Sequence, residues 1–176
     1  MSPSTFFSFL FTLSLIIISS YAAPPPHAAP PPQKKYEVVC RGDAHCLKVL
    51  GSDPRIVAAT EWVPLCSYIL EMGANYGVKA QTYVKGLYSK YPSSEALKLC
   101  VNEDYTYSIN SFRSSLGELI EDPMTANYDA KVAGDGPGMC QSALAREKLV
   151  IPAINAFNDG IKFFSNVAFE ATNYLY

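Results

Sequence analysis

Five cysteines constrain what this chain can fold into more than any other feature of its sequence. They are Cys40, Cys46, Cys66, Cys100 and Cys140, in a chain of 176 residues that opens with a leader typical of secreted proteins. Thiols pair and stay paired in an oxidising compartment, so four of the five are expected to form structural disulfides rather than to act as metal ligands or nucleophiles. One cysteine must then be left over.

The chain divides into three parts by composition. Residues 1–22 resemble a signal peptide, because an apolar run from Phe6 to Ile18 precedes small residues that suit cleavage after Ala22 or Ala23. Residues 23–35 are rich in proline and alanine, a composition that extends as polyproline II and cannot bury a core. We therefore expect a signal peptide, a linker, and one folded domain at residues 36–176 of a secreted, extracellular protein.

The domain is predicted to be all-α, because apolar residues recur every three or four positions in its long segments. The first series is Trp62, Leu65, Ile69, Met72, Tyr76, Ala80, Tyr83 and Leu87. Similar series run from Tyr105 to Leu119 and from Ile154 to Leu175, the latter preceded by Pro152 in a first-turn position. Another helix should begin at Asp122 and Pro123 and should kink or break at residues 134–138, which are poor helix formers. Four helices with short connections predict an antiparallel up-and-down bundle.

The expected arrangement of the helices suggests how the cysteines pair. Cys40 and Cys46 flank a turn before the bundle and can reach one another locally. Cys100, early in the second helix, and Cys140, late in the antiparallel third helix, would meet across the bundle. Cys66 lies on or beside the apolar stripe of the first long helix, so we expect it to be a buried free thiol.

The cysteine spacing, the N-terminal hairpin and the helical pattern together resemble the plant invertase and pectin methylesterase inhibitor family. The similar elements, in order, are Cys46–Pro54, Tyr105 shortly after Cys100, Ala126-Asn127, and Cys140. The resemblance covers nearly the whole domain. It implies a short N-terminal helical hairpin closed by the first cysteine pair, a four-helix bundle with a second disulfide between helices two and three, and an inhibitor without a cofactor.

Three departures from the family pattern bear on these expectations. Cys40 and Cys46 are closer together than in typical members, and Gly136-Pro137-Gly138 stands where many members keep a polar helical turn. Some invertase inhibitors carry a Pro-Lys-Phe element after the last cysteine, whereas this chain has Glu147-Lys148-Leu149. This difference favours pectin methylesterase as the partner. Acid invertase of the cell wall or vacuole is the alternative, and a non-inhibitory secreted recognition module is a further one.

The residues that contact the partner cannot be carried over from the family, because the family's contacts do not form a motif. The resemblance implies only that the bundle docks beside the carbohydrate-binding cleft of the esterase and blocks the entry of pectin. Helical geometry suggests the polar flanks of the first two bundle helices as partner contacts: Thr82, Lys85, Thr106, Asn110 and Arg113.

An enzyme is disfavoured by the shortage of catalytic side chains. The two histidines, His27 in the linker and His45 inside the first cysteine loop, leave almost no material for a Ser-His-Asp triad or a multi-histidine metal site. The adjacent acids at 103–104 and 121–122 point in different directions on a helix and are expected to be solvated or to cap helix ends. A net charge of −2 gives no indication of nucleic-acid binding. No catalytic, cofactor-binding or metal-binding residue is predicted.

Overall fold

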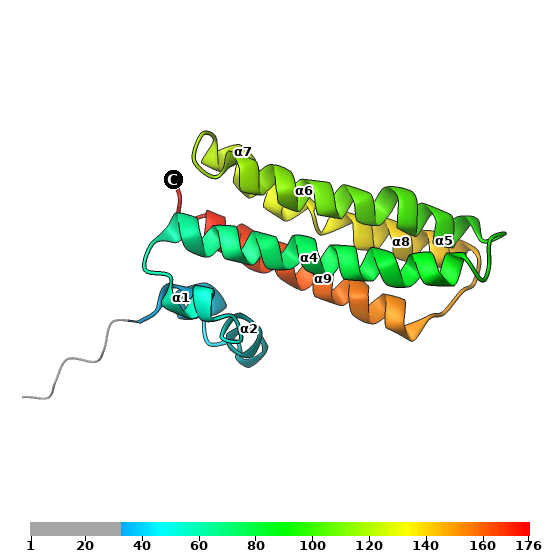
Figure 1. Ribbon diagram of the computed structural model, residues 1–176, viewed down its shortest axis with the longest axis horizontal. Coiled ribbons are helices and arrows are strands. Elements are labelled where there is room, and N and C mark those ends of the chain that lie inside the picture. The colour runs from blue at the N-terminus through cyan, green and yellow to red at the C-terminus, as the bar shows by residue number, and fades with distance from the viewer. Residues whose placement is uncertain (1–32) are drawn as a thin grey trace, which may run out of the picture. The chain divides into compact units, whose positions relative to one another are not determined.

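The computed structural model describes residues 33–176, so the predicted signal peptide and nearly all of the predicted linker lie outside the described residues. The described chain is helical throughout (Figure 1). Its elements are α1 (Lys35–Cys40), α2 (Ala44–Leu50), α3 (Pro54–Ala58), α4 (Trp62–Tyr88), α5 (Glu95–Leu99), a π-helical turn (Cys100–Asp104), α6 (Tyr105–Glu118), α7 (Pro123–Val132), α8 (Asp135–Arg146) and α9 (Pro152–Thr172). Within these described residues, no helix combines the length and the apolar character that crossing a membrane requires.

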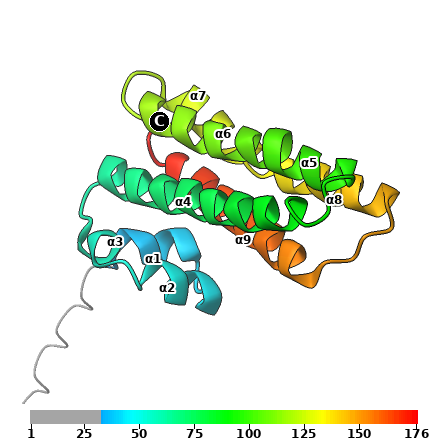
Figure 2. The ribbon, with the colours of Figure 1, turned by 45° about the vertical axis from the view of Figure 1, so that its right-hand side comes forward.

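Four antiparallel rods of helix form the bundle (Figures 1 and 2). The first rod is α4, the second joins α5, the π-helical turn and α6, the third joins α7 and α8, and the fourth is α9. Both α4 and α7 pack against α6 and α9, which closes the bundle around one core. The predicted all-α bundle with an N-terminal helical hairpin and two disulfides is confirmed.

Side-chain caps and prolines start the bundle helices, and α7 and α9 begin where the sequence predicts. Asp122 caps α7 by accepting a hydrogen bond from the Thr125 backbone N–H at 3.1 Å, and Pro123 is the first helical residue. Pro152 has the same place in α9. Ser94 caps α5, with its Oγ 3.2 Å from the Leu97 backbone nitrogen. None of these prolines costs a helical hydrogen bond, because the first-turn N–H groups have no intrahelical acceptor.

The buried face of α4 is wider than the predicted stripe. Tyr83 was expected in the core, but it is 39% exposed, and its ring lies 5.3 Å from the Phe157 ring between centroids. The reason is that α4 packs against α6 as well as α9, and the predicted stripe covers mainly the α9 side. On the α6 side the contact is made through Gly73 and Gly77, where an added Cβ would lie 2.8 Å from the Phe112 ring and 2.9 Å from Ile109. These glycines let the two helices approach closely.

The third rod is interrupted, as predicted, but the interruption is shorter and earlier. α7 ends at Val132, and α8 begins at Asp135 after a break at Ala133 and Gly134. We expected residues 134–138 to disrupt the helix, yet Gly136 and Pro137 are buried inside the first turn of α8. A proline is tolerated there because that turn has orphan N–H groups.

The N-terminal hairpin turns through two residues with left-handed backbone conformation. Arg41 ends α1 at a φ of 48°, and Gly42 follows at a φ of 83°, a region that glycine adopts without strain. Asp43 then caps α2, because its Oδ1 accepts a hydrogen bond from the Cys46 backbone N–H at 2.7 Å. Arg41 also forms an ion pair with Glu170 of α9. The tight loop between Cys40 and Cys46 is therefore built from turn and cap residues.

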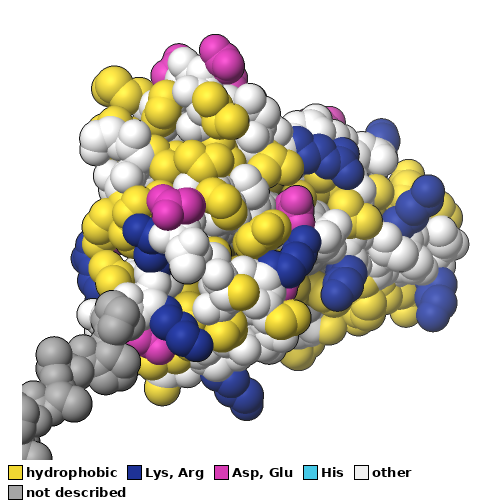
Figure 3. Space-filling view, turned by 60° about the vertical axis from the view of Figure 1, so that its left-hand side comes forward, with side chains coloured by type: hydrophobic (Ala, Val, Ile, Leu, Met, Phe, Trp, Pro, Cys, Tyr) yellow, Lys and Arg dark blue, Asp and Glu magenta, His cyan; other side chains and the backbone are white. Residues whose placement is uncertain are grey.

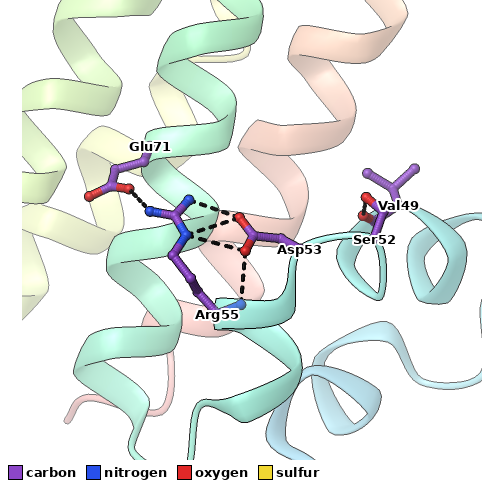
Figure 4. A network of polar contacts seen from close by, with 5 residues as sticks. All are labelled: Val49, Ser52, Asp53, Arg55 and Glu71. Carbon is purple, nitrogen blue, oxygen red and sulfur yellow. Dashed lines mark hydrogen bonds and ion pairs between the residues drawn. The ribbon is translucent and has the colours of Figure 1, made fainter.

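A polar network on the surface connects the hairpin region to the bundle (Figure 4). Arg55 of α3 reaches Glu71 of α4 through Nη1 at 2.8 Å and Asp53 through Nη2 at 2.8 Å. Hydrogen bonds from Arg55 hold the pKa of the Asp53 carboxyl below its ordinary value. Exposed ion pairs each stabilise a fold by only about 0–1 kcal/mol, so this network orients α3 more than it stabilises the domain.

Candidate functional site

Two disulfides fix the parts of the molecule on which any docking face depends. Cys40 is bonded to Cys46 and Cys100 to Cys140, the two pairs expected from the sequence, with Cα–Cα distances of 5.4 and 4.7 Å. Cys66 is a free, fully buried cysteine, and burial raises the pKa of its thiol to about 12. A thiol that stays protonated is a poor nucleophile, so Cys66 serves as a core packing residue.

The π-helical turn sets the position of Cys100, and a hydrogen bond from α4 stabilises it. A wider turn breaks the regular hydrogen-bond ladder and leaves a carbonyl to be satisfied from outside. Gln81 of α4 does this, because its Nε2 donates to the Val101 carbonyl at 2.7 Å and to the Thr106 Oγ1 at 2.8 Å. The same side chain therefore joins the first and second rods beside the disulfide.

Asp104, in this turn, is buried rather than solvated, so the sequence-based expectation for this residue was wrong. Its side chain is only 7% exposed, and its Oδ2 has no hydrogen-bond partner among the described residues. The extra residue of the π-helical turn changes which side chains face inward, and helical periodicity does not anticipate this. By contrast Asp122 caps α7, as expected of the second acidic pair.

Burial gives Asp104 an unusual titration. The pKa of the carboxyl is raised to about 6, first by burial and then by the neighbouring charge of Glu103, while the charge of Arg146 opposes both. The carboxyl group lies within 4.8 Å of the sulfurs of Cys100 and Cys140. Sulfurs joined in a disulfide are not thiolates, so this group of three does not make a metal site.

The titration of Asp104 predicts how stability depends on pH. Between about pH 4 and pH 6 the folded protein keeps a proton that the unfolded chain has released, so stability falls as the pH rises through this window. We expect Asp104→Asn to remove that fall and to raise the free energy of unfolding at pH 7 by about 1–3 kcal/mol. Urea denaturation of both proteins from pH 4 to pH 7 measures it. Glu121→Gln, at an exposed position, is the control and should leave the pH dependence unchanged. If the stability of Asp104→Asn fell with pH as steeply as that of the unsubstituted protein, the prediction would be contradicted.

The partner contacts predicted from helical geometry lie on one flank of the bundle. Thr82 and Lys85 of α4 and Asn110 and Arg113 of α6 are exposed there. Thr106 is half-buried, because its hydroxyl accepts the hydrogen bond from Gln81. This flank is polar and basic, and its role as an enzyme contact stays a prediction.

A second surface, over α6, α7 and α8, was missed by the sequence analysis. We call it the α6–α7 face. Its exposed apolar side chains are Tyr107 (40% exposed), Ile120 (74%), Met124 (69%), Tyr128 (63%) and Met139 (43%). The signal was present in the sequence, because Met124 and Tyr128 recur four positions apart on the side of α7 opposite its alanine seam. Large exposed apolar side chains that gather on one surface are typical of interaction sites.

Acidic groups surround the apolar side chains of this face. Its carboxylates are Glu118, Asp122, Asp129 and Asp135. They lie close enough to affect one another and Tyr107: burial and then the charge of Asp129 raise the pKa of Glu118, and burial and then the charge of Asp135 raise the pKa of Tyr107. At the top of Figure 3, magenta side chains border yellow ones at this end of the bundle. The surface therefore suits a partner that presents basic groups around apolar pockets.

Buried polar contacts hold α7 rigidly under this face. Asn127 donates from Nδ2 to the Phe169 carbonyl at 2.9 Å and to Thr172 Oγ1 at 2.8 Å in α9. Ser115 of α6 donates to the Ala126 carbonyl at 2.7 Å, and Ser165 of α9 donates to the Ala130 carbonyl at 2.8 Å. A helix fixed from both neighbours loses little conformational freedom when a partner docks on it.

The segment that follows the last cysteine makes structural contacts with the rest of the bundle. Glu147 accepts hydrogen bonds from the Ser94 hydroxyl at 2.6 Å and the Ala96 backbone N–H at 2.8 Å, which caps α5. Leu149 lines an apolar hollow of about 590 Å³ together with Leu87 and Leu97, at the end of the bundle where α4 ends and α5 begins. Glu147 is thus bound to the protein's own helix terminus.

Known proteins similar to this chain were found only by structure. No protein-family profile and no curated protein sequence matches it. The fold is similar to a mutant form of a pectin methylesterase inhibitor from Arabidopsis, with a TM-score of 0.67 and 19% identity over 80% of this chain and 97% of that chain. It is also similar to a pectin methylesterase inhibitor from Arabidopsis thaliana, with a TM-score of 0.61 and 19% identity over 82% of this chain and 98% of that chain. At this identity, the likeness establishes a shared fold.

Proposed function

We propose that this protein is a secreted inhibitor of pectin methylesterase and belongs to the plant invertase and pectin methylesterase inhibitor family. The observation that carries the proposal is the near-complete coverage of two solved pectin methylesterase inhibitors by this chain's fold. The chemistry agrees with a binding protein. His45, the only histidine among the described residues, packs its ring against Phe163 at 4.9 Å between centroids. The buried carboxyl of Asp104 and the buried thiol of Cys66 are both disfavoured as charged groups.

The α6–α7 face is our proposed contact with the esterase. It combines exposed aromatic and methionine side chains with carboxylates on a helix that buried polar contacts hold in place. Interfaces are enriched in aromatic residues and methionine, and a few such anchors provide most of the binding energy. An inhibitor of this kind acts by covering the enzyme's cleft, with no reaction of its own.

Glu147 bears on the choice between the two enzymes. In some invertase inhibitors the region after the last cysteine enters the enzyme's site, but here the Glu147 carboxylate caps α5 instead. The same hydrogen bonds lower the pKa of Glu147, which keeps this cap ionised in acidic surroundings. The arrangement supports pectin methylesterase rather than acid invertase as the target.

Titration of each enzyme with the purified protein tests the proposal. We expect stoichiometric, reversible inhibition of pectin methylesterase and little effect on acid invertase. Potent inhibition of invertase with none of the esterase would reverse the choice of target. No effect on either enzyme would support a non-inhibitory recognition module.

Removal of one aromatic side chain tests the contact surface. We expect Tyr128→Ala to raise the inhibition constant at least about tenfold, the effect of losing one anchor of a docking face. Tyr91→Ala is the matched control, because Tyr91 is 61% exposed against 63% for Tyr128 but lies at the other end of the bundle. Equal effects of the two substitutions, or none from Tyr128→Ala, would move the contact away from the α6–α7 face.

A further inference from the structure

A second hollow lies between the second and third rods, where α8 runs beside α5 and the π-helical turn (Figures 1 and 2). Its volume is about 590 Å³, and three carboxyl groups line it, those of Glu103, Asp104 and Asp135. The Ser142 hydroxyl and the Arg146 guanidinium also belong to its lining. The hollow therefore carries three acidic groups against one basic group. We call it the acidic hollow.

Asp104 gives the acidic hollow an enclosed carboxyl group that lacks a hydrogen-bond donor. The residue is only 7% exposed, and its Oδ2 accepts no hydrogen bond from any residue between 33 and 176. Enclosed polar atoms are nearly always paired, because an unpaired atom has lost its water without gaining a protein partner. The fold is therefore less stable for keeping a carboxyl here. A donor from another molecule would compensate for this cost.

The basic groups of this chain leave the Asp104 carboxyl unpaired. Arg146 is exposed and forms no ion pair with any residue from 33 to 176, although its charge acts to lower the pKa of Asp104. Glu103, beside Asp104 in the turn, acts to raise that pKa. Lys98, the basic residue of α5, is paired with Glu95 at 3.2 Å. The acidic hollow is therefore open to a cationic group from outside.

The acidic hollow is continuous with the α6–α7 face. Met139 belongs to both, because it is an exposed apolar side chain of that face and also lines the hollow. Asp135 belongs to both as well, and after burial its charge is the next largest cause that raises the pKa of the Tyr107 hydroxyl. A partner that covers Tyr107 and Met139 therefore also covers the mouth of the hollow.

We propose that the acidic hollow receives one basic side chain, a lysine or an arginine, of the bound esterase, and that Asp104 and Asp135 are its acceptors. The identity of the partner rests on the proposed function; the hollow and its unpaired carboxyl rest on the contacts above. A cationic side chain supplies the N–H donors that Asp104 lacks, and charge-assisted hydrogen bonds are stronger than neutral ones. An anionic group would meet three carboxyl groups, and an apolar group would leave Asp104 unpaired.

This role predicts opposite effects of one substitution on stability and on inhibition. Asp104→Asn removes the buried acid, so the variant should unfold less readily at pH 7, as argued above for the titration of this residue. The same change removes the charge that binds the basic side chain of the esterase, so the variant should inhibit more weakly. A residue that acts only through the fold does not give this combination, because a more stable inhibitor would inhibit at least as well.

Inhibition of pectin methylesterase, measured beside unfolding in urea, tests the inference at pH 7. We expect Asp104→Asn to raise the inhibition constant at least about tenfold, as expected for an enclosed charge pair. Asp135→Asn, at an exposed position on the rim, should raise it about threefold. Asp159→Asn is the matched control, because Asp159 is exposed on α9 beside Tyr76 of α4. It should change inhibition less than about twofold, since solvent and salt screen distant exposed charges.

Each outcome decides one point. Unchanged inhibition by Asp104→Asn, with an unsubstituted protein that inhibits, would overturn the inference and leave the proposed function standing. Equal losses of inhibition in Asp104→Asn and Asp159→Asn would mean that only net charge matters, and would also overturn it. Weaker inhibition together with lower stability in Asp104→Asn would assign the carboxyl to the fold instead. An unsubstituted protein that does not inhibit the esterase would remove the proposed function and this inference with it.

Discussion

Gly136→Ala is expected to destabilise the protein by about 3 kcal/mol or more, among the largest effects of any single methyl group in this fold. A Cβ at this position would overlap the backbone carbonyl of Asp104 and the hydroxyl of Ser108 in the facing rod. The carbonyl cannot move cheaply, because it belongs to the helical backbone beside the Cys100–Cys140 disulfide. The change in the free energy of unfolding in urea measures this effect.

Gly138 provides the control, since it lies two residues along the same helix with no atom within 4 Å of an added Cβ. Gly138→Ala should be neutral or stabilise the protein by up to about 1 kcal/mol, the difference in helix propensity between the two residues. A neutral or stabilising effect in both variants would mean that the glycines differ from alanine in helix propensity alone. That result would contradict the close packing of α8 on the π-helical turn.

The contrast between these two glycines shows what the sequence could predict about this fold. Apolar periodicity predicts four helical rods. Asp122 with Pro123, and Pro152, predict where the third and fourth rods start, because caps and first-turn prolines act locally. Gly136 and Gly138 look equivalent in the sequence, and we expected the whole segment around them to break the helix. Their different roles depend on the distance to another rod, which no local pattern encodes.

The π-helical turn accounts for the error at Asp104. A sequence without a proline or a glycine at residues 100–104 gives no local sign of the wider turn. The turn places Cys100 opposite Cys140 and turns Asp104 inward, and it depends on a hydrogen bond from Gln81, which is about 20 residues away in the chain. Because such interactions join residues far apart in the chain, the sequence could predict that a helix is present here but not whether the Asp104 side chain is buried.

For the candidate site, charge and exposure had to come from the structure. The sequence predicted contacts on the α4–α6 flank, and four of those five residues are exposed there. The α6–α7 face was overlooked because Met124 and Tyr128 count as apolar residues in a helix whose seam was assigned to alanines. When small residues form the buried seam of a helix, large apolar residues on its opposite side are exposed. A sequence analysis could use this difference in side-chain size between the two sides of a helix to find an interaction surface.

Loss of the Cys100–Cys140 disulfide is expected to be the most damaging of the cysteine changes. The bond closes a loop of 40 residues, and the chain-entropy estimate for such a loop is about 4 kcal/mol, against about 2 kcal/mol for the 6-residue separation of Cys40 and Cys46. All four cysteines are buried, so loop length rather than burial sets this ranking. Each disulfide holds a different part of the molecule.

The two double variants Cys100→Ala/Cys140→Ala and Cys40→Ala/Cys46→Ala test this ranking in one series of urea titrations. We expect the first to lose about twice as much stability as the second, and Cys66→Ala, which leaves only a small void, to lose less than the first. Inhibition should follow the same order, since the longer staple fixes α8 against the rod that carries Tyr107, whereas the shorter one lies in the N-terminal hairpin. A larger loss from the hairpin disulfide would mean that the hairpin, through α1 and its contacts with α4 and α9, governs the stability of the bundle.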